Sequence, residues 1–96
     1  MKILVYGLGR YTERIVDLIR KEHDVIAYSD SYSAIQSYGK KKFVRPKEIK
    51  HTDFDYIIVT VVDRKQALKI RDNLTSQYLI PLRKIIPFLY TVTRQI

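Results

Sequence analysis

The sequence contains no cysteine, only three glycines and only three prolines among its 96 residues. Without cysteine, disulfides and cysteine-ligated zinc are excluded, and a cytoplasmic location is the simpler expectation. No apolar run approaches the ~20 residues of a membrane span. The first residues do not resemble a signal peptide, because only four apolar residues separate Lys2 from the first glycine. With 46% hydrophobic residues, the chain is expected to form one small globular domain.

Acidic residues are also few, since 10 acidic residues stand against 18 basic ones and give a net charge of +8. The excess lies in residues 40–50, with six cations and one anion, and in residues 64–96, with seven cations and one anion. Such clusters attract phosphates, nucleic acid or an anionic surface. No known nucleic-acid motif appears, so a nucleic-acid-binding domain is the less favoured alternative.

The opening segment predicts a strand, a glycine turn and a helix in direct succession. The apolar run 2–6 leads into Gly7-Leu8-Gly9, and helical spacing follows over 10–21, with an apolar face formed by Tyr11, Ile15, Leu18 and Ile19. In a dinucleotide-binding turn, Gly-x-Gly-x-x-Gly, the first glycine permits the turn and the second lets the backbone approach a pyrophosphate. The alternative is that Gly7 and Gly9 only make a tight turn.

Thr12 stands where that fingerprint has its third glycine, which normally lets the helix pack closely on the strand. Its side chain either holds the helix further from the strand or donates its hydroxyl to a phosphate. The next strand, 25–28, ends at Ser29-Asp30, and Asp30 lies 21 residues after Gly9. An acid at this spacing accepts the ribose hydroxyls of an adenosine. Alternatively, Asp30 caps the turn that follows.

Residues 31–39 predict a short helix with Gly39 as its stop, and Phe43-Val44 predicts a brief third strand at the sheet edge. The lysines at 40–42 either protect that edge or, with Arg45, contact a phosphate such as a 2′-phosphate beside Asp30. Pro46 predicts the start of one helical turn.

The second half predicts a central strand over 56–62, beside the first strand, with Thr60 near Gly7 and Gly9 at its carboxyl end. A helix over 64–77 with Asp63 as its N-cap and a short strand over 83–87 follow. The expected fold is therefore α/β: a small doubly wound, mostly parallel sheet of order 3-2-1-4-5 in one domain, 1–88, with a tail at 89–96.

No catalytic pattern is found. His23 and His51 fall at predicted element ends, no spacing marks a catalytic triad, and no metal-ligand cluster is evident. The sequence leaves open whether the protein is an enzyme.

Several motifs in order carry a resemblance: Val5-Tyr6-Gly7-Leu8-Gly9, the strand-end Asp30, the acidic and aromatic lead-in at 53–59, and Ile80-Pro81 before 84–87. Residues 2–88 resemble the small NAD(P)-binding Rossmann domains of bacterial polysaccharide-biosynthesis and sugar-modifying proteins, such as epimerase/dehydratase-like proteins and the N-terminal domains of sugar acyltransferases. The turn 7–11 is also similar to nucleotide-binding regulatory domains of potassium channels.

The resemblance implies NAD or NADP as cofactor, with Gly7, Gly9, Arg10 and Thr12 at the pyrophosphate and Asp30 at the ribose. It favours a nucleotide- or nucleotide-sugar-binding module that is not catalytic alone and acts with a partner catalytic domain or as a homo-oligomer. The alternative is the cofactor-binding fragment of a larger NAD(P)-dependent sugar enzyme.

Overall fold

The computed structural model describes residues 1–9, 12–31, 37–38, 41–61 and 63–87. In chain order the elements are β1 (Lys2–Tyr6), α1 (Thr12–Ile19), β2 (Asp24–Ser29), β3 (Ser37–Tyr38), β4 (Lys41–Lys42), the 3₁₀ helix η1 (Pro46–His51), β5 (Tyr56–Val59), α2 (Arg64–Ser76), the 3₁₀ helix η2 (Leu82–Lys84) and β6 (Ile85–Pro87). The alternation of strands and helices confirms the predicted α/β class.

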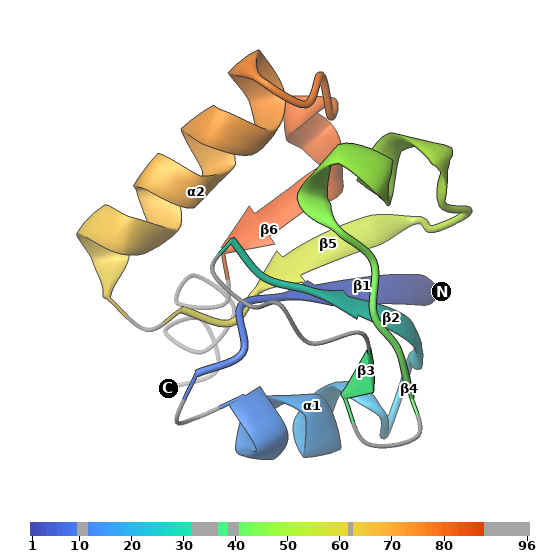
Figure 1. The fold of residues 1–96 in the computed structure, drawn as a ribbon. Helices are drawn as coiled ribbons and strands as arrows, with labels where there is room; N and C mark the ends of the chain where they lie inside the picture. Colours follow the sequence, from blue (N-terminus) through green and yellow to red (C-terminus); the bar gives the residue numbers. More distant parts are fainter. Residues whose placement is uncertain (10–11, 32–36, 39–40, 62, 88–96) are drawn as a thin grey trace.

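One parallel sheet of order β2-β1-β5-β6 organises the described residues (Figure 1). β1 pairs with β2 on one side and with β5 on the other, and β5 pairs with β6, all in parallel. Parallel neighbours need a crossover connection, and α1 and α2 supply two of them. The prediction that the strand at 56–62 lies beside the first strand is confirmed.

The predicted third strand at Phe43-Val44, on the β2 edge of the sheet, is wrong. Phe43 forms only an isolated parallel bridge with Tyr28, and Val44 N donates a hydrogen bond to Tyr28 O at 2.7 Å. Extension stops there because Arg45 is extended before Pro46, which lacks an N–H and starts η1. The sheet therefore has four strands instead of the five predicted in the order 3-2-1-4-5. The segment around Phe43 contacts β2 only at this bridge.

The helix predicted over 31–39 is also corrected at its end. Ser37 and Tyr38 form β3, which pairs antiparallel with β4 in a separate two-stranded ribbon. Only two residues connect these strands, and a connection of that length selects a hairpin rather than a helix stop. Residues 32–36 lie outside the described part of the chain, as do Gly39 and Lys40.

The helices lie on opposite faces of the sheet: α1 on one face, α2 and η1 on the other (Figure 1). Because side chains alternate along a strand, β1 serves both cores. Leu4 and Tyr6 join the core beneath α2, with Ala67 and Leu74 of that helix. Ile3 and Val5 pack toward α1.

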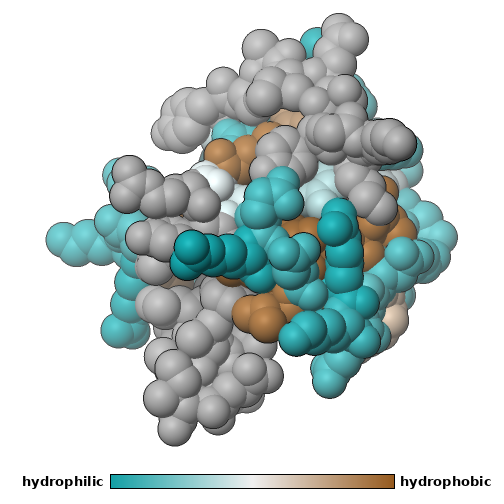
Figure 2. Space-filling view, turned by 90° about the horizontal axis from the view of Figure 1, so that it is seen from below, coloured by the Kyte–Doolittle hydropathy of each residue, from teal (hydrophilic) through white to brown (hydrophobic). Residues whose placement is uncertain are grey.

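The buried face of α1 differs from the predicted one. Thr12, Ile15, Val16 and Ile19 are buried, at spacing i, i+3, i+4 and i+7, whereas Leu18 is 56% exposed. Figure 2, seen from the α1 side, shows apolar surface between hydrophilic side chains on this face. Tyr11 lies outside the described residues.

The second half matches its prediction more closely. Asp63 is the N-cap of α2, because its Oδ1 accepts hydrogen bonds from Lys65 N at 2.9 Å and Gln66 N at 3.2 Å. The predicted helical turn at Pro46 is confirmed as η1. The last strand, predicted over 83–87, is shorter, because η2 precedes it and β6 begins at Ile85. The predicted tail at 89–96 lies outside the described residues. Within those residues, each helix is either too short or too polar to cross a membrane.

Candidate functional site

The carboxyl ends of β1, β2 and β5 meet around the glycine turn. Tyr6 lies opposite Val59 in the register of β1 and β5, and Thr60 N donates to Tyr6 O at 2.9 Å. On the other side, Gly7 N donates to Ser29 O at 2.8 Å. In open α/β sheets, ligands bind at this edge, where the chain crosses from one half of the sheet to the other.

Gly7 is glycine for conformational reasons. Its φ is +105°, a region that other residues rarely adopt. A Cβ at this position would also lie 3.0 Å from Val61 Cγ2 and 3.3 Å from Thr60 Oγ1. The turn therefore brings the backbone of β1 closely against the residues that follow β5.

Two buried threonine hydroxyls fix the inside of the turn. Thr12 is fully buried, and its Oγ1 accepts from Gly9 N at 2.8 Å and donates to Gly7 O at 2.9 Å. Thr60 Oγ1 also reaches Gly7 O, at 2.7 Å, and lies 3.3 Å from Thr12 Oγ1. These contacts join α1 to the end of β5 through a pair of residues 48 positions apart.

This geometry revises the role expected of Thr12. A hydroxyl has one hydrogen, and in this structure the hydrogen of Thr12 is committed to a carbonyl inside the turn. This arrangement favours a structural role for Thr12, and its contact with a phosphate stays a prediction. Thr12 thus occupies the place of the fingerprint's third glycine as a bracing residue.

The carboxylate of Asp30 is bound to the same turn. Leu8 N donates to Asp30 Oδ2 at 2.6 Å, so the end of β2 is joined to the residue between the two glycines. A charged acceptor on a backbone amide makes a strong hydrogen bond, which fixes the carboxylate beside the turn.

Gly9 differs from Gly7 in every respect. It is exposed, its φ is outside the left-handed region, and a Cβ built on it would meet no atom of the described residues within 4 Å. Neither conformation nor internal packing requires a glycine here. Among the residues that the structure describes, none would block a ligand from approaching the backbone of Gly9.

A pocket of about 320 Å³ lies next to this turn, on the α2 side. One stripe of α2, with spacing i, i+3, i+4 and i+7, lines it together with Ser31: Gln66, Lys69, Ile70 and Asn73. The hydroxyl of Tyr6, whose side chain is buried, is hydrogen-bonded to Ser31 Oγ. The pocket wall is thereby tied to the residue that precedes Gly7.

The structure brings Gly7, Gly9, Thr12, Asp30 and Thr60 together in one hydrogen-bonded group through the Leu8 amide. Arg10, the remaining predicted residue, lies outside the described part of the chain. Sequence reasoning missed Ser31 and the polar stripe of α2. The signal was present, because Gln66, Lys69 and Asn73 place two amides and a cation at helical spacing around Ile70.

The family model described as C2185-like, N-terminal matches residues 1–86. The chain belongs to the C2185-like N-terminal family. No curated protein matches the sequence. The match covers every element of this C2185-like domain up to β6, including the turn, Asp30 and the α2 stripe.

The side chains around the turn of this C2185-like domain are mostly polar. Around the turn, the described residues supply hydroxyls, amides, a carboxylate and one lysine. No group of three or more metal-ligating side chains occurs within the part of the chain that the structure describes. Such a set orients a polar ligand by hydrogen bonds.

Proposed function

We propose that this C2185-like domain binds a nucleotide or dinucleotide, of the NAD or NADP type or a nucleotide-sugar, across the carboxyl ends of β1, β2 and β5. The observation that carries the proposal is the open backbone of Gly9 beside the anchored Asp30. In a dinucleotide site, the second glycine of the turn has no side chain so that a pyrophosphate can lie against its backbone.

Asp30 and the α2-side pocket support a place for the nucleoside. The carboxylate stands at the end of β2, where an adenosine ribose is bound in dinucleotide-binding sheets. Ser31 follows Asp30 directly in the sequence and lines the pocket. Gln66 and Asn73 carry amides, each with a donor and an acceptor, which is the pairing that a purine edge presents.

The phosphates are expected over Gly9 and the start of α1. The amides of Gly7, Leu8 and Gly9 are engaged inside the protein, with Ser29 O, Asp30 and Thr12 as acceptors. In a site with the full fingerprint, such amides help to bind the pyrophosphate. Here the binding of a phosphate is expected to depend more on the dipole of α1 and on Arg10. This difference favours weak binding, in the range of tens of micromolar or above.

We assign no catalytic step to this domain. The described residues around the turn supply no pair of nucleophile and base and no metal site. The resemblance to sugar-modifying Rossmann domains favours a binding module that works in polysaccharide or nucleotide-sugar metabolism with a partner catalytic domain. The alternative of a cofactor-binding fragment of an NAD(P)-dependent sugar enzyme places the same ligand at the same turn.

The proposal is tested by titrating the ¹⁵N-labelled protein with NAD(H), NADP(H), ATP and UDP-sugars while recording amide spectra. We expect the amide signals of residues 7–9, Asp30 and Ile70 to shift together with one of these ligands. Gly9→Ala should weaken that binding about tenfold, because the new methyl group occupies the ligand's space. Its stability should match that of the unmodified protein.

A second variant tests the ribose contact with a matched control. Asp30→Asn keeps an oxygen for the Leu8 amide but removes the charge, so nucleotide binding should weaken about tenfold. Asp24→Asn makes the same change at the exposed opposite end of β2 and should have no effect. The proposal fails if no ligand shifts these signals at millimolar concentration, or if Gly9→Ala and Asp30→Asn bind as the unmodified protein does.

A further inference from the structure

Large apolar side chains are exposed mainly at one edge of the sheet. Among the described residues, four such side chains are more than half exposed: Met1, Leu18, Leu79 and Leu82. Leu18 lies on α1, whereas Met1 directly precedes β1, and Leu79 and Leu82 lie between α2 and β6. Three of the four therefore lie at the amino ends of the strands, the opposite edge from the glycine turn. Exposed apolar groups that gather in one place mark a contact surface.

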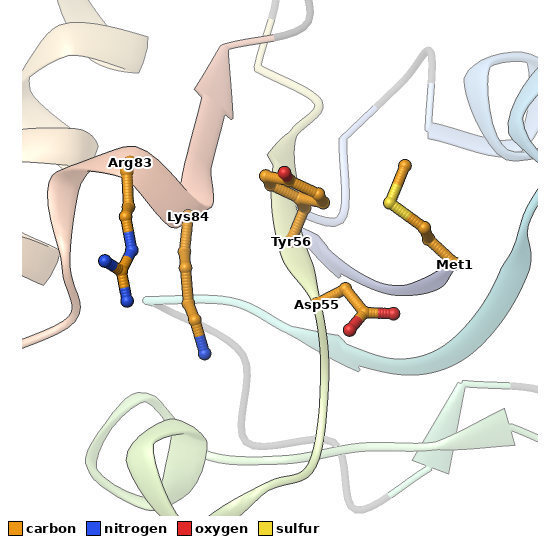
Figure 3. Close-up of a pocket in the computed structure, with 5 residues that line it drawn as sticks. All are labelled: Met1, Asp55, Tyr56, Arg83 and Lys84. Carbon is orange, nitrogen blue, oxygen red and sulfur yellow. The ribbon is translucent and has the colours of Figure 1, made fainter.

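A second pocket, of about 280 Å³, joins the two ends of the described chain at this edge. Met1, Asp55, Tyr56, Arg83 and Lys84 line it (Figure 3). Arg83 and Lys84 belong to η2, which begins at Leu82, so the exposed Met1 and the exposed loop before β6 border the same hollow. We call this surface, formed by Met1 and residues 79–84, the amino edge.

Leu79 is exposed in a strained conformation. Its φ is 58°, in the left-handed region where glycine or asparagine normally follows a helix. Its side chain is largely exposed, so packing within the described residues does not require a leucine here. A residue that is kept against its own backbone preference and outside the core points to a role beyond folding.

Basic side chains outnumber acidic ones around the amino edge. Arg83 and Lys84 directly follow Leu82. η1 packs on the same core as the loop before β6, since Ile49 and Ile80 belong to one cluster, and Figure 1 shows the two segments beside each other. Together with the residues before β5, the basic groups are Lys2, Lys47, Lys50, Arg83 and Lys84, and the acidic ones are Glu48, Asp53 and Asp55. This excess does not include the amino group of Met1, which would add to it.

Two of the three carboxylates are engaged with the start of β1. Asp53 forms an ion pair with Lys2, and Asp55 Oδ2 accepts a hydrogen bond from Lys2 N at 2.7 Å. On the other side of the Tyr56 ring, Figure 3 shows Arg83 and Lys84 next to each other. The amino edge thus combines exposed aliphatic side chains with neighbouring cations.

We propose that the amino edge docks on the surface of an anionic lipid bilayer. Met1, Leu79 and Leu82 enter the boundary between headgroups and acyl chains, where buried apolar area contributes to binding. Arg83 and Lys84 bind the lipid phosphates, and the remaining basic excess attracts the negative surface. The Tyr56 ring lies beside these residues at the level of the headgroups, which suits an amphipathic ring.

Two other occupants agree less well with this surface. A second copy would place the basic excess of one chain against that of the other, and each chain carries a net charge of +8. A nucleic acid would be attracted by the charge, but its bases stack on aromatic rings and it offers no apolar phase to the leucines. An anionic bilayer satisfies both the charges and the aliphatic side chains.

The test is co-sedimentation of the full chain with two kinds of vesicle, one of phosphatidylcholine alone and one of equal parts phosphatidylcholine and phosphatidylglycerol. Binding to the mixed vesicles should be about tenfold stronger, because the cations contribute only where the lipid is anionic. Raising the salt concentration should weaken it, because salt screens the surface charge. Nucleotide binding is measured without lipid, so either proposal can fail while the other stands.

The leucines are tested with a matched control. Leu79→Gly and Leu82→Ser should each weaken binding to the mixed vesicles about fivefold, because each removes an aliphatic chain from the bilayer. Leu18→Ser removes a leucine of similar exposure from α1 and should leave binding unchanged. Leu79→Gly relieves the left-handed strain, so a loss of binding in this variant does not come from unfolding.

The charge is tested in the same way. Arg83→Gln should weaken binding to the mixed vesicles about fivefold. Arg64→Gln changes an exposed arginine at the start of α2, at the other edge of the sheet, and should weaken binding by less than about twofold.

The inference is overturned if the mixed vesicles bind no more strongly than phosphatidylcholine alone, or if Leu79→Gly and Leu82→Ser bind as the unmodified protein does. A loss in Leu18→Ser as large as theirs would also overturn it. Sedimentation equilibrium without vesicles covers the remaining occupant: a dimer that Leu82→Ser dissociates would show that a second copy, and not lipid, covers the amino edge.

Discussion

Gly7 and Gly9 belong to one short turn, yet they are glycine for different physical reasons. The first has a φ of +105° and close neighbours, and the second has an ordinary φ and no close neighbour among the described residues. A stability measurement separates the two roles without any ligand.

Gly7→Ala should lower the free energy of unfolding by about 2 kcal/mol. The alanine would be strained at this φ, and its methyl group would press on Val61 Cγ2 at 3.0 Å. Urea unfolding followed by circular dichroism measures the change. Gly9→Ala is the control and should stay within about 0.5 kcal/mol of the unmodified protein. Equal losses at both positions would contradict the distinction drawn here.

Thr12→Val should cost about 1–3 kcal/mol of unfolding free energy. The valine has nearly the same shape, but Gly9 N loses its acceptor and Gly7 O loses one of its donors in a fully buried place. Thr12→Ser keeps the hydroxyl and should recover most of the loss. The same urea unfolding curves decide the matter, and a Thr12→Val protein as stable as the unmodified one would show that the hydroxyl does not brace the turn.

At the scale of the element, α2 has a well-formed start and an unusual end. Asp63 caps its first turn, as its sequence predicts. Beyond its end, Leu79 adopts a φ of 58° with 72% of its surface exposed. Glycine or asparagine normally occupies such a left-handed position after a helix.

Leu79→Gly should therefore raise the free energy of unfolding by about 0.5–1 kcal/mol. The variant relieves the left-handed strain and loses almost no buried surface. Leu82→Gly is the matched control: this leucine is also largely exposed, at 58%, but has no positive φ, so its replacement should be neutral or destabilising. Thermal unfolding of the two variants side by side measures the difference; a loss in Leu79→Gly would mean that its side chain has a packing role.

At the scale of the whole molecule, Tyr28 links stability to pH. Its side chain is buried in the α1-side core, and its hydroxyl accepts from Arg20 Nη2 at 3.0 Å. Burial raises the pKa of Tyr28, and the charge of Arg20 opposes the rise only in part. Because the pKa is higher in the folded protein, this contribution is fully present below pH 10, the ordinary pKa, and is lost as the pH rises through the folded value.

Tyr28→Phe should thus flatten the loss of unfolding free energy above pH 10. Arg20→Gln should move the pKa of Tyr28 further up, because it removes the group that lowers it. Urea unfolding across alkaline pH and the ultraviolet absorbance of tyrosinate measure the two effects. An unchanged alkaline slope in Tyr28→Phe would show that other groups cause it.

The sequence by itself determined the elements whose signals are local. Apolar runs mark β1 and β5, helical spacing and the Asp63 cap mark α2, and a glycine pair marks the turn, because each depends on residues within a few positions. It also predicted that β1 and β5 are neighbours and that Thr60 reaches the turn.

Only the tertiary structure decided the contacts between distant residues. Thr12 stabilises the turn together with Thr60, whose hydroxyl lies beside that of Thr12 although the two residues are 48 positions apart. Phe43 meets Tyr28 at one bridge instead of forming a strand, since the chain turns into η1 at Pro46. The pocket of Asp55 and Arg83 exists because β5 and β6 start side by side. Such contacts join residues far apart in the sequence, so no pattern within a few positions predicts them.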